Sequence, residues 1–314
     1  MANLDWLPED LLPAALRLAH ADAIAYEAGR EALEWSRTGP VSIARRILPT
    51  GIEQVYVEAV RPVPPRISLL FSDAVNHLRS VLDNVIFHMT KTAHCGELTE
   101  SQERSIAFPI FTENQSMKKW MKSMRSKGLP QLTLDSPLGE RILALQPFND
   151  SLNVVPSMSA LISSMWDQRV HQAHPIILLK LYSNTDKHRS LRTAVNKGFQ
   201  SIRGNHWVDD QRSLLELTVG EILGETTPGN QTIAELHPSI MVERPESNGT
   251  LVGIGPELNF LILYVAHYAV PFLVTGGPKD QGLPPQIDLS DSGELLEDRI
   301  RGPHMSQHMN GSGK

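Results

Sequence analysis

The stretch HLRSVLDNVIFH, residues 77–88, decides how this chain is expected to fold. Its apolar residues recur every three or four positions, and the pattern extends over residues 67–92. On a helical projection at about 100° per residue, apolar and polar positions occupy opposite arcs. The apolar arc holds Phe71, Ala74, Val75, Leu78, Val81, Leu82, Val85, Ile86 and Met89, and the polar arc holds Asn76, His77, Arg79, Ser80, Asp83, Asn84 and His88. This pattern predicts an amphipathic core helix over residues 67–92.

The polar side of this helix differs from an ordinary exposed face. Phe87 lies within the polar arc, and several of its neighbours are short hydrogen-bonding residues rather than the Glu, Lys and Gln that usually fill exposed helical positions. Such residues suit a face covered by other structure, where each group has a fixed partner. Arg79 and Asp83 stand one turn apart and can pair. Three interpretations stay open: a covered structural network, a solvated face and a functional site.

A second polar cluster ends the segment LLKLYSNTDKHRSL, residues 178–191. The first half of this segment is apolar on all sides, which indicates a buried helix. In a helix over residues 175–194, Asn184 and His188 continue the apolar stripe of Ile177, Leu181, Leu191 and Val195. They should therefore point inward, where they need polar partners. We therefore expect this helix and the 67–92 helix to face each other across a polar layer.

This polar layer is the candidate site. In such a site His188 would carry protons, and Arg79 and Lys187 would hold an anion. The catalytic candidates are therefore His188, Arg79, Asp83 and Lys187. Binding or orienting roles are assigned to Asn76, His77, Asn84, Asn184, Asp186 and Arg189. The alternative is a buried network that fixes the register of two helices and catalyses nothing.

The rest of the chain predicts one α+β domain over residues 1–275, mainly a helical bundle with an antiparallel sheet. The helical core covers about 67–195 and 257–274, and a further helix is expected over 9–36. Residues 52–60 alternate as a strand does, and 198–254 hold short strand-like runs, so both are assigned to the sheet. Residues 276–314 lose periodicity and are predicted to form a mobile tail, with a short acidic helix around 291–301 as an option.

Composition excludes several classes of protein. The chain has 314 residues, a net charge of -6 and one cysteine, so we expect neither a DNA-coating protein nor a disulfide, and we expect a cytoplasmic location. The segment LNFLILYVAHYAVPFLV, residues 258–274, is interrupted by His267 and Pro271, which favours a buried core helix over a membrane span. The usual nucleotide-binding, hydrolase and metal-ligand motifs do not occur, so no cofactor and no metal are predicted.

One further segment carries a concentrated charge. Residues 115–127, QSMKKWMKSMRSK, predict a short helix with a methionine and tryptophan stripe and a basic remainder. Such a helix can bind phosphates, an acidic partner or a membrane surface. The simpler interpretation is a surface helix whose apolar side packs on the core.

The ordered segments FSDAVNHLRSVLDNVIF, AFPIF, ILALQPFND and ILLKLYSNTDKHRSLRTAV resemble a family of bacterial proteins that has no established activity. More loosely, the chain is similar to the HEPN superfamily of helical bundles, many of which are dimeric RNases. Their motif is an arginine followed after four to six residues by a histidine on a core helix. Arg79 matches it, but Asn84 stands where related sequences have the histidine, and His88 comes too late. The resemblance implies an RNA or nucleotide ligand and a homodimer.

Three hypotheses about function follow. In one, the protein is RNA- or nucleotide-directed, with a site between the 67–92 and 175–194 helices. In another, it is a non-catalytic binding or assembly protein whose polar layer is purely structural. In a third, it is an enzyme acting on a small acidic metabolite.

Overall fold

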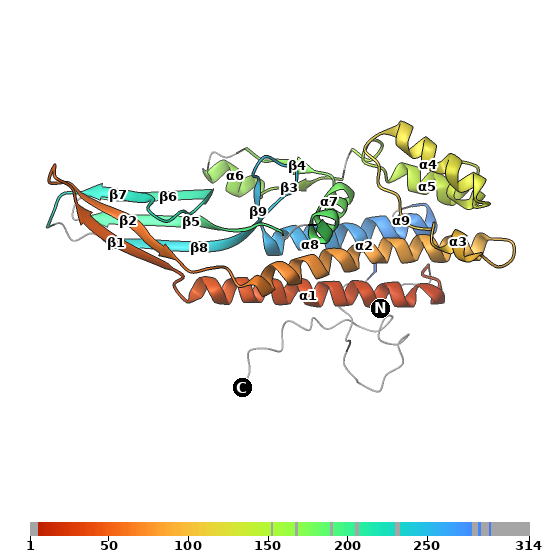
Figure 1. Ribbon diagram of the computed structural model, residues 1–314, viewed down its shortest axis with the longest axis horizontal. Coiled ribbons are helices and arrows are strands. Elements are labelled where there is room, and N and C mark those ends of the chain that lie inside the picture. The colour runs from red at the N-terminus through yellow and green to blue at the C-terminus, as the bar shows by residue number, and fades with distance from the viewer. Residues whose placement is uncertain are drawn as a thin grey trace.

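The structure is a computed structural model, and it describes residues 6–151, 153–166, 169–188, 191–204, 207–229, 233–277, 282–283 and 289. Its two larger sheets gather at one end of the long axis and its short helices α4 (Asn114–Ser126) and α5 (Pro137–Ala144) at the other, with long helices running between them (Figure 1). The prediction of an α+β fold with antiparallel sheets is confirmed.

The long helices form the core of the fold. The 3₁₀ turn η1 (Glu9–Leu11) leads into α1 (Leu12–Arg37), and α2 (Pro65–Ala93) packs against α1. Each long helix has a proline in its first turn, where the missing N–H costs nothing. The two helices are antiparallel, because Arg66 pairs with Glu27 near one end and His88 approaches Asp10 near the other. The predicted helix over 67–92 is confirmed, with its apolar arc buried.

The predicted apolar helix over 257–274 is also confirmed as a core element. It comprises α8 (Ile254–Tyr264), the π-helical turn η3 (Val265–Ala269) and α9 (Val270–Thr275), and α8 packs on α1 and α2. Among the described residues this is the one helix long and apolar enough to cross a membrane, and 56% of its most apolar window is buried in the protein. In the π turn the Val270 N–H bonds to the Val265 carbonyl, which leaves the Ala266 carbonyl free. That carbonyl accepts the N–H of buried Leu283 at 2.9 Å.

This contact fixes Leu283, which lies in the segment that was predicted to be a mobile tail. Gly276 ends α9 in a left-handed conformation, and Gly282 and Leu283 pack beside the π turn. Leu289 is exposed. Residues 278–281, 284–288 and 290–314 lie outside the described residues, as does the predicted short acidic helix.

The strands form two main sheets where one was expected. One sheet has the order β1 (Val41–Ile47), β2 (Glu53–Val60) and β7 (Ile222–Thr226). The other has the order β6 (Trp207–Glu216), β5 (Thr193–Gly204), β8 (Ile233–Glu243) and β9 (Leu251–Gly253), and all pairs are antiparallel. The predicted strand at 52–60 therefore joins part of the 198–254 region, but only through β7. Its other neighbour, β1, was not predicted, because Arg45 and Arg46 interrupt its apolar pattern.

Shorter elements follow α2 along the chain before β5 begins. They are α3 (Glu100–Glu103), which opens with a capping box at Thr99, α4 (Asn114–Ser126), η2 (Pro130–Leu132), α5 (Pro137–Ala144), the two-stranded hairpin of β3 (Val155–Pro156) and β4 (Gln172–Ala173), α6 (Ala160–Trp166) and α7 (Pro175–His188). Two predicted boundaries need correction. The helix expected over 175–194 ends at His188, and Thr193 already begins β5.

Candidate functional site

Arg79 and Asp83 bind the backbone of Phe108. The Arg79 guanidinium donates to the Phe108 carbonyl, and the Phe108 N–H donates to Asp83 Oδ1 at 2.9 Å. The two side chains also pair with each other, at 3.5 Å between Nη2 and Oδ1. Burial lowers the pKa of Arg79, and the charge of Asp83 opposes that change. Both backbone groups of a buried residue are thus satisfied by one turn of α2.

The segment around Phe108 is therefore a cover for the polar arc of α2. The Phe108 ring lies under the Arg79 guanidinium, 5.9 Å from its centroid to Cζ, and is fully buried. Next to it, buried Gln146 donates to the Pro109 carbonyl and accepts the Phe111 N–H. The expectation of a covered polar face holds for this part of α2, but residues 106–111 supply the cover.

Asn76 is the place where α2 meets α7. Its side-chain carbonyl accepts from the Ser183 hydroxyl at 2.9 Å, and its amide donates to Asp186 Oδ2 at 3.0 Å. The predicted contact between the two helices is thus present, through Ser183 and Asp186. Asn184, however, is exposed rather than inward. The predicted stripe was drawn through Leu191 and Val195, and neither residue belongs to α7.

The remaining residues of the predicted layer either face elsewhere or are not described. The side chains of Lys187 and His188, and all of Arg189, lie outside the described part of the chain. His77 turns to α1, where its ring meets that of His20 edge-on at 4.8 Å. Burial lowers the pKa of His77, and the charges of His20 and Arg17 lower it further.

Asn84 also lies away from the Arg79 contact. With Phe87 and His88 it lines a pocket of about 530 Å³ between α2 and the start of α1. Phe87, the apolar residue within the polar arc, is thus half-buried at the α1 side. The predicted site residues whose side chains are described do not form one cluster: Arg79 and Asp83 bind Phe108, Asn76 and Asp186 join two helices, and His77 and Asn84 face α1.

A buried ion pair lies beside Tyr182 in the middle of α7, and the sequence arguments missed it. Arg244 follows β8 and forms a two-point contact with Glu257 of α8, at 2.9 and 2.7 Å, with both side chains at most 2% exposed. Glu257 also accepts from the Tyr182 hydroxyl at 3.0 Å. Burial and the Glu257 charge raise the pKa of Tyr182 well above its usual value. A lone glutamate at the start of the most apolar segment was the one available signal, since a buried acid needs a partner.

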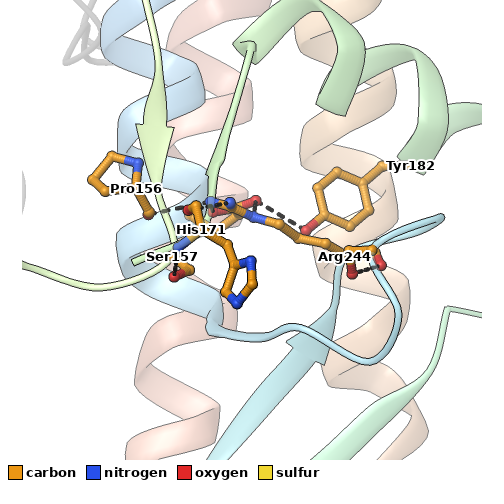
Figure 2. A network of polar contacts seen from close by, with 7 residues as sticks. Pro156, Ser157, His171, Tyr182 and Arg244 are labelled. Atoms are coloured by element: carbon orange, nitrogen blue, oxygen red, sulfur yellow. Dashed lines mark hydrogen bonds and ion pairs between the residues drawn. The ribbon is translucent and has the colours of Figure 1, made fainter. Parts of the chain in front are cut away.

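Arg244 also reaches the β3–β4 hairpin. Figure 2 shows its side chain extending between Pro156 and His171, and it donates to both backbone carbonyls at 3.2 and 3.3 Å. Arg244 N–H further bonds to the Thr250 carbonyl, and the Ser247 hydroxyl donates to the Arg244 carbonyl. One residue thus fixes a hairpin and a loop relative to each other.

That hairpin and loop border an open cavity of about 720 Å³. It is lined by Ser157, Met158, Arg169, His171, Arg192, Glu216 and residues 246–251. Arg192 is held on its wall by Glu216 and by Glu243 outside the cavity. Most of the lining residues have polar side chains and they carry both signs of charge, which suits a small molecule with polar groups.

A second buried cluster lies where α7 begins. His174 Nδ1 accepts the Ile176 N–H at 3.2 Å, so the imidazole caps the helix, and Nε2 lies 3.4 Å from Asp150 Oδ2. Both residues are buried, and the Tyr264 ring stands 5.9 Å from that of His174. Burial lowers the pKa of His174, against the opposing charge of Asp150, and raises the pKa of Tyr264 well above its usual value.

Within the described ranges, no group of three or more His, Cys, Asp or Glu side chains is placed to hold a metal ion.

The basic helix α4 packs its apolar side on the core, as the simpler interpretation predicts. Met117, Met121 and Met124 are buried, and the lysines of the helix are exposed. Arg125 pairs with Asp135 across the turn that follows.

Comparison with known proteins finds no family model, no curated protein and no solved structure that matches this chain.

Proposed function

We propose that this protein is a non-catalytic binding protein in which the polar face of α2 holds the fold together. The observation that carries the proposal is the use of Arg79 and Asp83. Both are engaged with the backbone of buried Phe108, where a reacting group would have to displace part of the core. A guanidinium that already satisfies a buried carbonyl is costly to redirect to a substrate.

The position that would carry the catalytic histidine also supports this proposal. Asn84 occupies it, and its side chain lines the pocket at α1 rather than the contact made by Arg79. An amide does not exchange protons near neutral pH, so it cannot act as general acid or base. His88 lies on the same α1 side, near Asp10.

The competing proposal is an RNA-directed enzyme between α2 and α7, favoured by one contact. Asn76 binds Asp186, which is the first residue of the DKHR segment. The test is therefore a cleavage assay with fluorescent single-stranded RNA, using wild type, Arg79→Ala and His188→Ala, with folding checked by circular dichroism.

We expect wild type to leave the RNA intact, and Arg79→Ala to show a lower urea midpoint. Arg104→Ala is the matched control, because Arg104 makes a helical i,i+4 pair that is almost fully exposed. Cleavage by wild type that vanishes in either variant, with folding intact, would overturn the proposal in favour of the enzyme.

A further inference from the structure

We infer that the 720 Å³ cavity between the β3–β4 hairpin and the loop at 244–251 binds a small molecule that contains a phosphorylated sugar. Nucleoside monophosphates and free sugar phosphates both contain this group. The inference rests on the proposed binding function and names its ligand. Sites for small molecules commonly measure about 300–1,000 Å³, so the volume suits a ligand of this size.

One wall of the cavity offers donors for a phosphate. Arg169 and His171 are two residues apart in the segment before β4, which has no regular secondary structure, and both line the cavity. Among the described residues, neither side chain has an assigned hydrogen bond or ion pair, and both are exposed. A planar guanidinium matches the paired oxygens of a phosphate, and an imidazole adds a further donor.

The loop at 246–251 offers groups for sugar hydroxyls. Its residues Glu246 and Asn248 line the cavity, and within the described chain neither side chain makes a hydrogen bond or ion pair. Both have a left-handed backbone, with φ of 58° and 54°, and Gly249 follows at 87°. Left-handed backbone is costly for glutamate and is kept only where the surroundings impose it. A carboxylate accepts from vicinal hydroxyls, as acidic residues do with ribose in dinucleotide sites.

Arg244 fixes these two walls before any ligand arrives. Its buried side chain bonds to the carbonyls of Pro156 and His171 in the hairpin (Figure 2), and its backbone bonds to Ser247 and Thr250 in the loop. The guanidinium is itself held by Glu257. A site whose walls are already ordered loses less entropy on binding.

The charges distinguish a phosphorylated sugar from simpler ligands. The charge of Arg192 is balanced by Glu216 and Glu243. Among the described residues that line the cavity, this leaves the Arg169 guanidinium to pair with an anionic group of a ligand. A bare phosphate would meet Arg169 but would leave Glu246 facing another negative group. A ligand with a phosphate at one end and hydroxyls at the other satisfies both walls.

Isothermal titration calorimetry on the full chain tests the inference, with AMP, ribose 5-phosphate, inorganic phosphate and adenosine as separate probes. We expect AMP or ribose 5-phosphate, or both, to bind with a Kd below about 1 mM. Inorganic phosphate and adenosine should each bind at least tenfold more weakly than the better of those two. Binding of AMP alone identifies a nucleotide site, and equal binding of both identifies a sugar phosphate site.

Two variants and one control locate the site. Arg169→Ala should weaken the phosphorylated probes at least tenfold, and Glu246→Gln should weaken them several-fold, whereas Arg104→Ala should leave the Kd unchanged. The inference is wrong if folded wild type binds neither phosphorylated probe, or if Arg169→Ala binds as wild type does. Neither result bears on the RNA assay, so failure of this site and failure of the proposed function remain distinguishable.

Discussion

Replacing Arg79 with alanine tests the role of the α2 polar face most directly. In the structure its guanidinium donates to the Phe108 carbonyl and pairs with Asp83. The substitution leaves a buried carbonyl without that donor and a half-exposed carboxylate without its counter-charge. We expect the free energy of unfolding to fall even though no catalytic step is involved.

The magnitude follows from the two losses. A hydrogen bond to a charged group contributes about 1.5–3 kcal/mol, and leaving its buried acceptor unsatisfied is part of that cost. The ion pair with Asp83 adds only about 0–1 kcal/mol, since the Asp83 side chain is 36% exposed and water can replace the charge. Arg79→Ala should therefore destabilise the protein by about 2–4 kcal/mol.

Urea unfolding followed by circular dichroism measures this loss, with Arg104→Ala as the matched control. Arg104 and Glu100 also form an i,i+4 pair, but their side chains are 81% and 85% exposed, so the control should change by at most about 0.5 kcal/mol. Asp83 offers a second comparison, because Asp83→Asn keeps an acceptor for the Phe108 N–H and Asp83→Ala does not. If Arg79→Ala matches Arg104→Ala, or Asp83→Asn is as damaging as Asp83→Ala, the structural role is refuted.

Three further predictions concern other parts of the molecule. Burial lowers the pKa of His174 below its usual value of about 6.5, so as the pH falls the unfolded chain takes up the proton first. The contribution of His174 to stability should therefore be complete above about pH 6.5, and below it the free energy of unfolding should fall by at most about 1.4 kcal/mol per pH unit. In urea unfolding measured at several pH values, the free energy of unfolding of His174→Gln should depend less on pH than that of wild type. Glu257→Gln leaves Arg244 buried without its counter-charge and should cost about 3–5 kcal/mol in urea unfolding, whereas a loss under about 1 kcal/mol would mean that water reaches the pair. Gly139→Ala would drive a methyl group into a neighbouring backbone carbonyl and should lower the Tm, while Gly255→Ala, which has open space in the first turn of α8, should leave it unchanged or raise it; equal shifts would contradict the close approach at Gly139.

The sequence predicted the helices of the core well, because their apolar periodicity is long and regular. Residues 67–92 differ from α2 by only a few residues at the ends. It also indicated that the polar side of α2 is covered, from Phe87 and the short polar residues. What the pattern could not indicate was the cover itself. Residues 106–111 have no helical or strand periodicity, so nothing in them specifies which surface their backbone groups bond to.

The inward direction expected for Asn184 failed for a different reason. The angular stripe that placed it was extended to Val195, across a helix end that no glycine or proline marks. Thr193 begins a strand there, and a helical projection has no meaning beyond the last helical residue. The buried pair of Arg244 and Glu257 was missed because its two residues are 13 positions apart, with a strand and a helix start between them. Their partnership is set by tertiary packing, which local pattern does not record.

The contrast between the two polar regions decides where function should be sought. Around Phe108, the contacts of Arg79 and Asp83 are made within the fold, and α2 gains a fixed cover from them. In the cavity beside Arg244, by contrast, Arg169 and Glu246 face open space with no assigned partner in the described chain. Folding satisfies most of the polar groups that it buries. Exposed polar groups on cavity walls that a buried ion pair holds in place are therefore the better candidates for binding a ligand. The polar residues of the stretch HLRSVLDNVIFH therefore stabilise the fold, and the residues near Arg244 are the better candidates for a binding site.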